Sequence, residues 1–325
     1  MQELKITMLG PTGVGKTSLL TAMYEQFETT VGRTNLQLTP DEESSAILQE
    51  RLVELKTLLD DFEARGGVQA TEAPAGPDSL RSFVFGLGKK GQKPSLQLHF
   101  RDYPGGYLAA RSTTEERKFV KSLLTECVAV IIAIDAPALM EANGKWHELI
   151  NRPQQMTDLF KTAYQELDSP RLVIFAPVRC EKYLQDEKSK AELLRRVKDG
   201  YAKLFDLFSS EALLSQVVAV ITPVQTVGTV VFSRIELNSS KPHFHFRKTS
   251  PDAEYNPKDS EQPLRYLLRF VLKLHLDSRT AGFFNFIRDF FGVNNHLKEA
   301  VVEFTKGCKT AGGFAVVQGE PWLNI

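Results

Sequence analysis

A glycine-rich octet near the N-terminus combines residue types and spacing that could do chemistry. Residues 10–17 read Gly-Pro-Thr-Gly-Val-Gly-Lys-Thr and fit the pattern G-x-x-x-x-G-K-[ST] completely. Glycines let backbone N–H groups turn inward around phosphate oxygens, where a Cβ atom would clash. The ammonium of Lys16 suits β- and γ-phosphates, and the hydroxyl of Thr17 suits Mg²⁺. The pattern therefore predicts a phosphate site formed by Gly10, Pro11, Thr12, Gly13, Val14, Gly15, Lys16, Thr17 and Ser18.

A second motif, Asp102-Tyr-Pro-Gly105, follows a predicted strand over residues 95–100. Together with the first motif it resembles the D-x-x-G element of Ras-like small GTPases, within the wider class of P-loop GTPases. The Asp-Tyr-Pro-Gly-Gly run also resembles bacterial GTPases described as double-GTPase-like. The resemblance implies that Asp102 lies on the Mg²⁺ side of the site and that Gly105 senses the γ-phosphate. Asp102 could alternatively serve only to form the turn before Pro-Gly-Gly.

The residue after Gly105 departs from the Ras-like pattern. That family commonly has a glutamine there, which orients the attacking water, whereas this chain has Gly106. We therefore expect slow hydrolysis unless another group, such as Arg111, Glu115 or a partner protein, completes the site. Many ATPases place a catalytic glutamate directly after the acidic residue, but the neighbour here is Tyr103.

The residues that would recognise the base follow a predicted strand over 171–176. In Ras-like proteins an N/T-K-x-D motif stands there, and by position Arg179 matches its lysine and Glu181 its aspartate. The resemblance implies that Arg179 stacks on guanine and that Glu181 accepts from N1–H and the N2 amine. Val178 replaces the polar first residue of the motif. Glu181 could instead simply begin the next helix.

The family's remaining metal ligand is a threonine upstream of the second strand. The resemblance implies Thr71 for this role, with Thr29, Thr30 and Thr34 as rivals. The stretch from Lys16 to Asp102 is much longer than in small family members, and a heptad-patterned segment accounts for most of the excess.

The order of elements indicates an α/β protein. Predicted strands cover 4–9, 80–86, 95–100, 128–134, 171–176 and 216–222, and predicted helices cover 17–27, 40–65, 145–167, 187–208 and 264–276, with a polar loop over 238–262. This alternation predicts a mostly parallel sheet with helices on both faces. With the two motifs, the resemblance implies a P-loop NTPase fold that has a helical insertion before the second strand. We expect a P-loop GTPase domain over 1–280, with the insertion at about 36–68, and a helical and aromatic C-terminal extension over 281–325.

Two segments are candidate surfaces for a protein partner. Apolar residues at heptad spacing cover 48–62: Leu48, Leu52, Leu55, Leu59 and Phe62. A second segment, 283–291, is unusually aromatic. Each could instead pack against the domain, and the scattered charges beside 283–291 disfavour a membrane-binding helix.

Composition excludes several classes of protein. The chain has 325 residues and equal numbers of acidic and basic residues, 40 of each, so its net charge is zero. This balance argues against general nucleic-acid binding, and 42% hydrophobic residues argue against dominant disorder. Three cysteines far apart and no apolar run long enough to span a bilayer predict a cytoplasmic protein. His243 and His245, which lack partners at metal-ligand spacing, are expected on the surface.

Taken together, the motifs predict a molecular switch that binds GTP and GDP with Mg²⁺. Thr17, Asp102 and Thr71 would hold the metal, Lys16 and Gly105 would act on the γ-phosphate, and hydrolysis to GDP would be slow. Two alternatives stay open. One is an ATP-binding P-loop enzyme, since the base motif is degraded, and the other is a nucleotide-loaded interaction module with negligible turnover.

Overall fold

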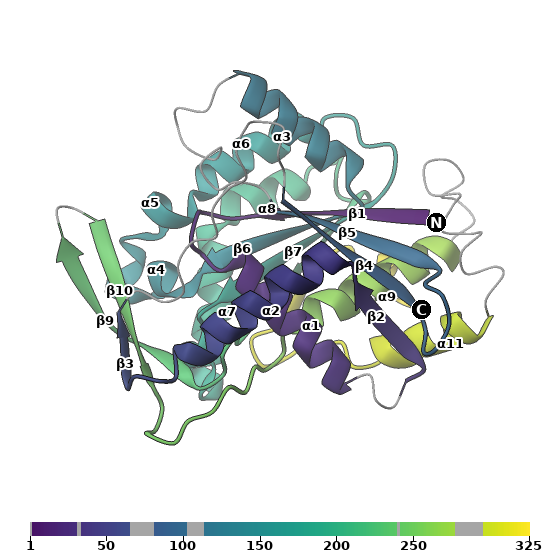
Figure 1. Ribbon diagram of the computed structural model, residues 1–325. Helices are drawn as coiled ribbons and strands as arrows, with labels where there is room; N and C mark the ends of the chain where they lie inside the picture. The colour runs from purple at the N-terminus through teal and green to yellow at the C-terminus, as the bar shows by residue number, and fades with distance from the viewer. Residues whose placement is uncertain (1, 31–33, 66–80, 103–113, 239–240, 277–294) are drawn as a thin grey trace.

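The computed structural model describes residues 2–30, 34–65, 81–102, 114–238, 241–276 and 295–325. Most strands of this part of the chain form one sheet, in the order β11-β8-β7-β6-β1-β5-β4-β2 (Figure 1). The strands are β1 (Gln2–Leu9), β2 (Leu36–Pro40), β4 (Arg81–Lys89), β5 (Leu96–Asp102), β6 (Ala129–Asp135), β7 (Arg171–Val178), β8 (Val217–Ile221) and β11 (Ala315–Gln318). The run β5-β1-β6-β7-β8 is parallel. The predicted α/β architecture with a mostly parallel sheet is confirmed.

Helices cover both faces of this sheet. They are α1 (Lys16–Thr30), α2 (Glu42–Thr57), α3 (Thr114–Glu126), α4 (Ala136–Met140), α5 (His147–Asn151), α6 (Pro153–Ala163), α7 (Glu187–Gly200), α8 (Ala202–Phe208), α9 (Gln262–Leu276) and α11 (Asn295–Thr305). The central strand β6 is buried throughout, and its residues alternate between two cores. Ile131 packs in a core with α1, α9 and α11, whereas Ile132 packs with α3, α6, α7 and α8. In Figure 1, α3 and α6 lie above the sheet, and α1, α9 and α11 lie below it.

The predicted insertion contains a strand as well as a helix. Its first residues form β2, which pairs antiparallel with β4 at the edge of the sheet. The helix expected over 40–65 is shorter, because α2 ends at Thr57 and β3 (Glu63–Arg65) follows. Just beyond α2, the Leu59 carbonyl accepts a hydrogen bond of 2.8 Å from the ammonium of Lys248. This tertiary hydrogen bond satisfies the Leu59 carbonyl, which in a longer helix would accept a hydrogen bond from a backbone N–H group of the next turn.

The heptad residues therefore divide between helix and loop. Leu48 and Leu55 are buried, while Leu52 and Leu59 are half-buried. Phe62 lies beyond the helix and keeps 48% of its surface exposed. The packed heptad residues face the domain itself, so a protein partner on this face stays a prediction.

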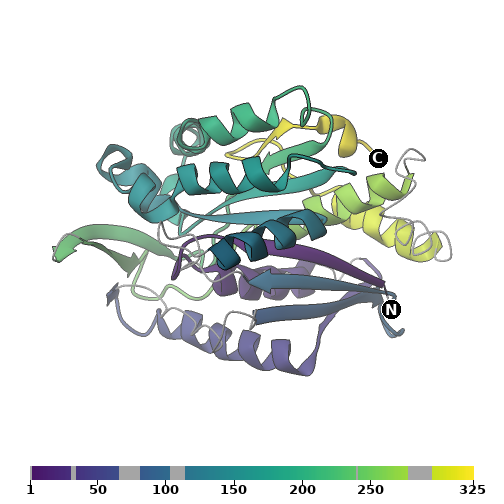
Figure 2. The ribbon, with the colours of Figure 1, turned by 90° about the horizontal axis from the view of Figure 1, so that it is seen from above.

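A second, three-stranded sheet was not predicted. It has the order β3-β10-β9, with β9 (Val230–Asn238) and β10 (Lys241–Lys248) antiparallel. Figure 2 shows the two strands projecting from the body at the end away from the C-terminus. The expectation of a polar loop over 238–262 is wrong for β10, as is the surface position of His245, which is buried with Nε2 2.9 Å from a Glu236 carboxylate oxygen. His243 is exposed as expected.

The C-terminal part of the chain contacts the main domain. In α11, the ring of Phe304 meets that of Phe27 of α1 edge-on, with centroids 5.2 Å apart. The last strand, β11, pairs antiparallel with β8 and so extends the main sheet. The aromatic segment 283–291 lies outside the described residues, and the domain boundary at 280 stays a prediction. No helix in the described ranges is both long enough and apolar enough to cross a membrane.

Candidate nucleotide-binding site

The glycine-rich loop lies between the end of β1 and the start of α1. Gly10, Gly13 and Gly15 have φ values of 150°, 76° and 105°, in the region that glycine tolerates and other residues rarely adopt. A Cβ atom on Gly10 would come within 2.9 Å of the Ala133 carbonyl oxygen of β6. Glycine is therefore needed at this position both for the backbone conformation and for the close approach of two strands.

The side chain of Lys16 folds back over this loop. Its ammonium donates to the carbonyl oxygens of Gly10, at 3.3 Å, and Pro11, at 3.5 Å. It also lies 3.5 Å from Oδ1 of Asp102, although the two residues are far apart in sequence. Lys16 is only 7% exposed. The structure thus brings together the two charged residues that the two motifs singled out.

Asp102 ends β5 beside Met8 of β1, at the same edge of the sheet as the loop. Burial raises the pKa of its carboxyl group, while the charges of Lys16 and Arg81 and a hydrogen bond with Thr17 act in the opposite direction. Its Oδ1 atom is buried and has no hydrogen-bond partner among the described residues, although the Lys16 ammonium lies 3.5 Å away. A buried carboxylate oxygen favours a cationic partner, which is the chemistry of a metal ligand.

The donor set fits Mg²⁺ held jointly with phosphate oxygens. Mg²⁺ takes oxygen ligands and is usually bound by one or two protein groups plus substrate phosphates. Thr17 and Asp102 provide such groups beside the phosphate loop. Within the part of the chain that the structure describes, no cluster of three or more His, Cys, Asp or Glu side chains could hold a metal alone.

The other residues expected near the metal and the γ-phosphate either lie outside the described residues or lie away from the loop. Thr71 and Gly105 lie outside the described residues, so their roles stay predictions. Thr29 and Thr30 form the last turn of α1. That turn is about 20 Å along the helix from Lys16, given 1.5 Å per residue. The structure therefore separates these two rivals of Thr71 from the phosphate loop.

Arg179 connects the predicted base side of the site to the phosphate loop. It follows β7 with an unusual φ of 56°. Its guanidinium donates to the Gly13 carbonyl of the loop and, at 2.9 Å, to Oδ2 of Asp135. Phe246 of the small sheet lies against the same guanidinium, 5.5 Å from ring centroid to Cζ. A side chain held on three sides is well positioned to line one wall of a site.

Glu181, the other predicted base contact, is 5% exposed and begins a short 3₁₀ helix, η4 (Glu181–Leu184). Its Oε1 accepts hydrogen bonds from the backbone N–H groups of Val227, at 3.3 Å, and Gly228, at 3.2 Å. Burial raises the pKa of this carboxyl group, against the opposing effect of those amides and of Arg179. The residue therefore holds the loop after β8 against the loop after β7.

A network of buried hydrogen bonds around Asp135, the anion that Arg179 contacts, was not predicted from the sequence. Asp135 is 2% exposed and its Oδ1 also accepts from the Ala138 amide, which caps α4. Asn151 bonds both backbone groups of Asp135 through its side chain, and its amide lies 3.0 Å from Nδ1 of His147. The available signal was an acidic residue at the end of an otherwise apolar strand, at the sheet edge where the loop lies.

No protein-family model matches the chain, and no curated protein matches it. Solved structures similar to it include the GTPase-like domain of Saccharomyces cerevisiae Ski7 bound to GDP and inorganic phosphate, with 15% identity and a TM-score of 0.35. The same domain bound to GTP gives 13% and 0.38. Both alignments cover 69% of this chain but only 43% of the Ski7 chain. A point variant of Aquifex aeolicus Era bound to GDP·AlF4⁻ gives 14% identity and a TM-score of 0.33, covering 85% of this chain and 67% of that one. These TM-scores are low, so the likeness carries no argument about function.

Proposed function

We propose that this chain binds GTP and GDP together with Mg²⁺ and works as a nucleotide-dependent switch of the Ras-like class. The observation that carries the proposal is the 3.5 Å approach of the Lys16 ammonium to the Asp102 carboxylate over the glycine loop. Two separate motifs thereby meet at one edge of the sheet, where parallel α/β proteins bind ligands. A cation for phosphate and a carboxylate for metal are the two charges that such a site needs.

Phosphate oxygens would take the hydrogen bonds of the loop amides and of Lys16. In the described structure the Lys16 ammonium is held only by two carbonyls and Asp102, all of which it can exchange for an anion. Bound Mg²⁺, held by Thr17 and Asp102, would neutralise charge on the β- and γ-phosphates. We propose Thr71 and Gly105 as the further contacts on the γ-phosphate side.

Hydrolysis would be attack of water on the γ-phosphorus, with cleavage of its bond to the bridging oxygen. GDP and inorganic phosphate would leave, and Lys16 would stabilise negative charge that develops on the oxygens. Because Gly106 replaces the usual glutamine, we expect this step to be slow. Stable occupancy by one nucleotide at a time is what a switch requires.

Guanine is the base that the charged residues favour. Guanine offers N–H donors at N1 and N2, which suit a carboxylate, whereas adenine offers an acceptor at N1. Glu181 supplies a carboxylate next to Arg179, which itself contacts the phosphate loop. We propose that these two residues line the base end of the site.

Nucleotide affinity of the purified protein tests this proposal. Fluorescent GDP and GTP analogues would be titrated with Mg²⁺, with unlabelled ATP as competitor, and Lys16→Ala is expected to weaken binding by about 100-fold or more, the loss of charge-assisted hydrogen bonds to phosphate. Lys306→Ala, which removes an exposed ammonium just beyond the end of α11, is the control and should bind normally. Preference for ATP would favour the alternative ATP-binding enzyme, and no binding to either nucleotide would overturn the proposal.

A further inference from the structure

The inserted helix α2 has an arginine on its buried face. The buried residues of α2 are Ser44, Leu48, Arg51 and Leu55, which recur at the spacing of one helical face. Arg51 is only 6% exposed. An arginine stays charged in proteins, so burying it is costly unless anions compensate. The position of this charge therefore requires an explanation.

The path of the chain directs α2 toward the phosphate end of the sheet. At its start, the hydroxyl of Ser44 accepts a hydrogen bond of 2.9 Å from the Val84 amide of β4. The charge of Arg81, the first residue of β4, acts on Arg51 further along the helix, so α2 runs from the level of Val84 toward Arg81. Arg51 lies about 10 Å beyond Ser44 at 1.5 Å per residue, which matches the three residues from Val84 to Arg81 at about 3.3 Å each. Arg51 is therefore level with the end of β4.

At that level lies the carboxylate of the candidate metal site. Arg81 pairs in register with Asp102 across β4 and β5, and Lys16 approaches Asp102 from the loop. Burial lowers the pKa of the Arg51 guanidinium; the charges of Glu54, Glu50 and Asp102 oppose this shift, and that of Arg81 adds to it. Three cationic side chains, those of Arg51, Arg81 and Lys16, thus act near the Asp102 carboxylate. A phosphate group bound there would interact with all three.

One partner of Arg51, Glu54, is only partly buried. The Nη1 atom of Arg51 lies 2.6 Å from Oε2 of Glu54, one turn further along α2, and the Glu54 side chain is 40% exposed. Ion pairs with exposed partners contribute little. A phosphate group can replace such a partner, since the planar guanidinium binds two oxygens at once.

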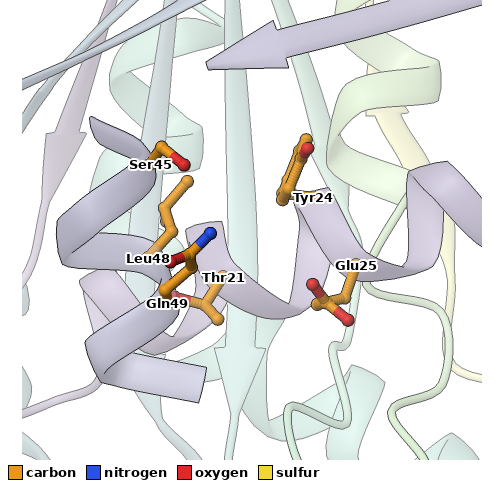
Figure 3. Close-up of a pocket in the computed structure, with 6 residues that line it drawn as sticks. All are labelled: Thr21, Tyr24, Glu25, Ser45, Leu48 and Gln49. Atoms are coloured by element: carbon orange, nitrogen blue, oxygen red, sulfur yellow. The ribbon is translucent and has the colours of Figure 1, made fainter. Parts of the chain in front are cut away.

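The packing of α2 leaves space for an adjustment. A cavity of about 200 Å³ lies between α1 and α2, lined by Thr21, Tyr24, Glu25, Ser45, Leu48 and Gln49 (Figure 3). Along α2 it lies one turn before Arg51, and along α1 one turn after Thr17. Close-packed interfaces resist displacement, whereas this one is incomplete beside the site.

We propose that Arg51 is a γ-phosphate contact supplied by the inserted helix, so that it makes the site prefer a nucleoside triphosphate to a diphosphate. The inference rests on the proposed nucleotide site and adds a specificity-determining residue to it. A triphosphate would draw the guanidinium from Glu54 toward the phosphate loop. Helix α2, and with it β3 and the small sheet, would then respond to the presence of the γ-phosphate.

The test compares triphosphate and diphosphate affinities of the full chain. Binding of GDP and of a non-hydrolysable GTP analogue with Mg²⁺ would be measured for the wild type, Arg51→Met and Arg51→Lys. Methionine keeps an unbranched apolar stem without the charge, and lysine keeps the charge without the planar fork. Arg51→Met is expected to weaken triphosphate binding by about 30-fold, the loss of hydrogen bonds to a charged group. The GDP affinity of Arg51→Met should change by less than about threefold. The triphosphate affinity of Arg51→Lys should lie between those of the wild type and Arg51→Met.

Two further variants control the experiment. Arg195→Ala removes an exposed arginine of α7 and should leave both affinities unchanged. Glu54→Gln removes the negative charge of one partner of Arg51 and is expected to strengthen triphosphate binding only. Equal losses for GDP and the analogue in Arg51→Met, or no loss in either, would overturn the role of Arg51 while leaving the nucleotide site intact. A wild type that binds neither nucleotide would overturn both proposals.

Discussion

Arg179 donates a hydrogen bond through Nη1 to Oδ2 of Asp135, 2.9 Å away, and so joins the ends of the neighbouring strands β7 and β6. The Asp135 carboxylate is almost fully buried, while the guanidinium is one-fifth exposed. The same guanidinium reaches the Gly13 carbonyl. One ion pair therefore fixes the phosphate loop relative to the predicted base end of the site.

Removing the buried carboxylate should destabilise the protein. Asp135→Ala leaves Arg179 without its anion and also removes the cap of α4, at a cost of about 3 kcal/mol or more. Asp135→Asn should cost less, because an amide oxygen can still cap the helix. Urea unfolding measures both. The control is Asp199→Ala, which breaks an exposed pair with Arg195 and should cost less than about 1 kcal/mol. Equal effects of Asp135→Ala and Asp199→Ala would show that the buried pair does not stabilise the fold.

Alanine at Gly10 should be more harmful than alanine at Gly91, another glycine with a positive φ. At Gly10 the new Cβ would meet both the Ala133 carbonyl oxygen, at 2.9 Å, and Val14, at 3.1 Å. At Gly91, where φ is 76°, nothing lies within 4 Å of a new Cβ. Gly91→Ala should therefore cost only the backbone strain, about 1–2 kcal/mol. Gly10→Ala adds a clash with β6 and should lower the melting temperature further. If both variants had the same melting temperature, the close approach of Gly10 to β6 would not contribute to stability.

The features predicted correctly from sequence were those encoded locally. The glycine-rich turn between β1 and α1 needs only residues within one octet, and a run such as Val128 to Ile134 signals a buried strand by composition alone. The mostly parallel sheet followed from the alternation of strands with helices, whereas the order of its strands was not predicted. That Asp102 lies beside Lys16 was an expectation from the family resemblance alone.

The small sheet could not be predicted because its strands come from two distant parts of the sequence and each has only a weak strand pattern. In β10, Phe244 and Phe246 alternate with histidine and arginine, but this strand pattern has only two apolar residues and lies in an otherwise polar segment. Its partner β3 stands nearly two hundred residues earlier, and His245 of β10 pairs with Arg65. The early end of α2 also depends on a contact that is distant in sequence. The ammonium of Lys248, in β10, donates a hydrogen bond to the Leu59 carbonyl just beyond α2. Contacts so distant in sequence leave no local pattern.

Acid should destabilise the protein through His147. Burial lowers the pKa of this imidazole below 6.5, with the Gly200 carbonyl acting against the shift. Its Nε2 lies 3.2 Å from that carbonyl, so Nδ1 is the atom that accepts from the Asn151 amide. Protonation of Nδ1 would place its N–H group against the N–H group of the Asn151 amide, and two donors cannot form a hydrogen bond. Below pH 6.5 the unfolded chain binds the proton more readily than the folded one, and the free energy of unfolding falls as the pH drops.

Urea unfolding at about pH 7.5 and about pH 5.5 measures this effect. His147→Leu should lose less stability between the two pH values than the wild type, although it is less stable overall. His243→Gln alters an exposed histidine and serves as the control, with the wild-type dependence. A His147→Leu variant that declined with acid as steeply as the wild type would assign the effect to other groups.

The base end of the site is tested by a change that preserves its fold. Glu181→Gln keeps an oxygen that can accept from the Val227 and Gly228 amides, so the loop after β8 should stay in place. It removes the negative charge and replaces one acceptor with a donor, which opposes the N–H groups of guanine. GTP affinity should fall by about tenfold or more, while ATP affinity stays the same or rises. Competition binding measures both, and circular dichroism with thermal melting checks the fold. If GTP affinity were unchanged in a stably folded Glu181→Gln variant, Glu181 would serve only to hold the two loops together.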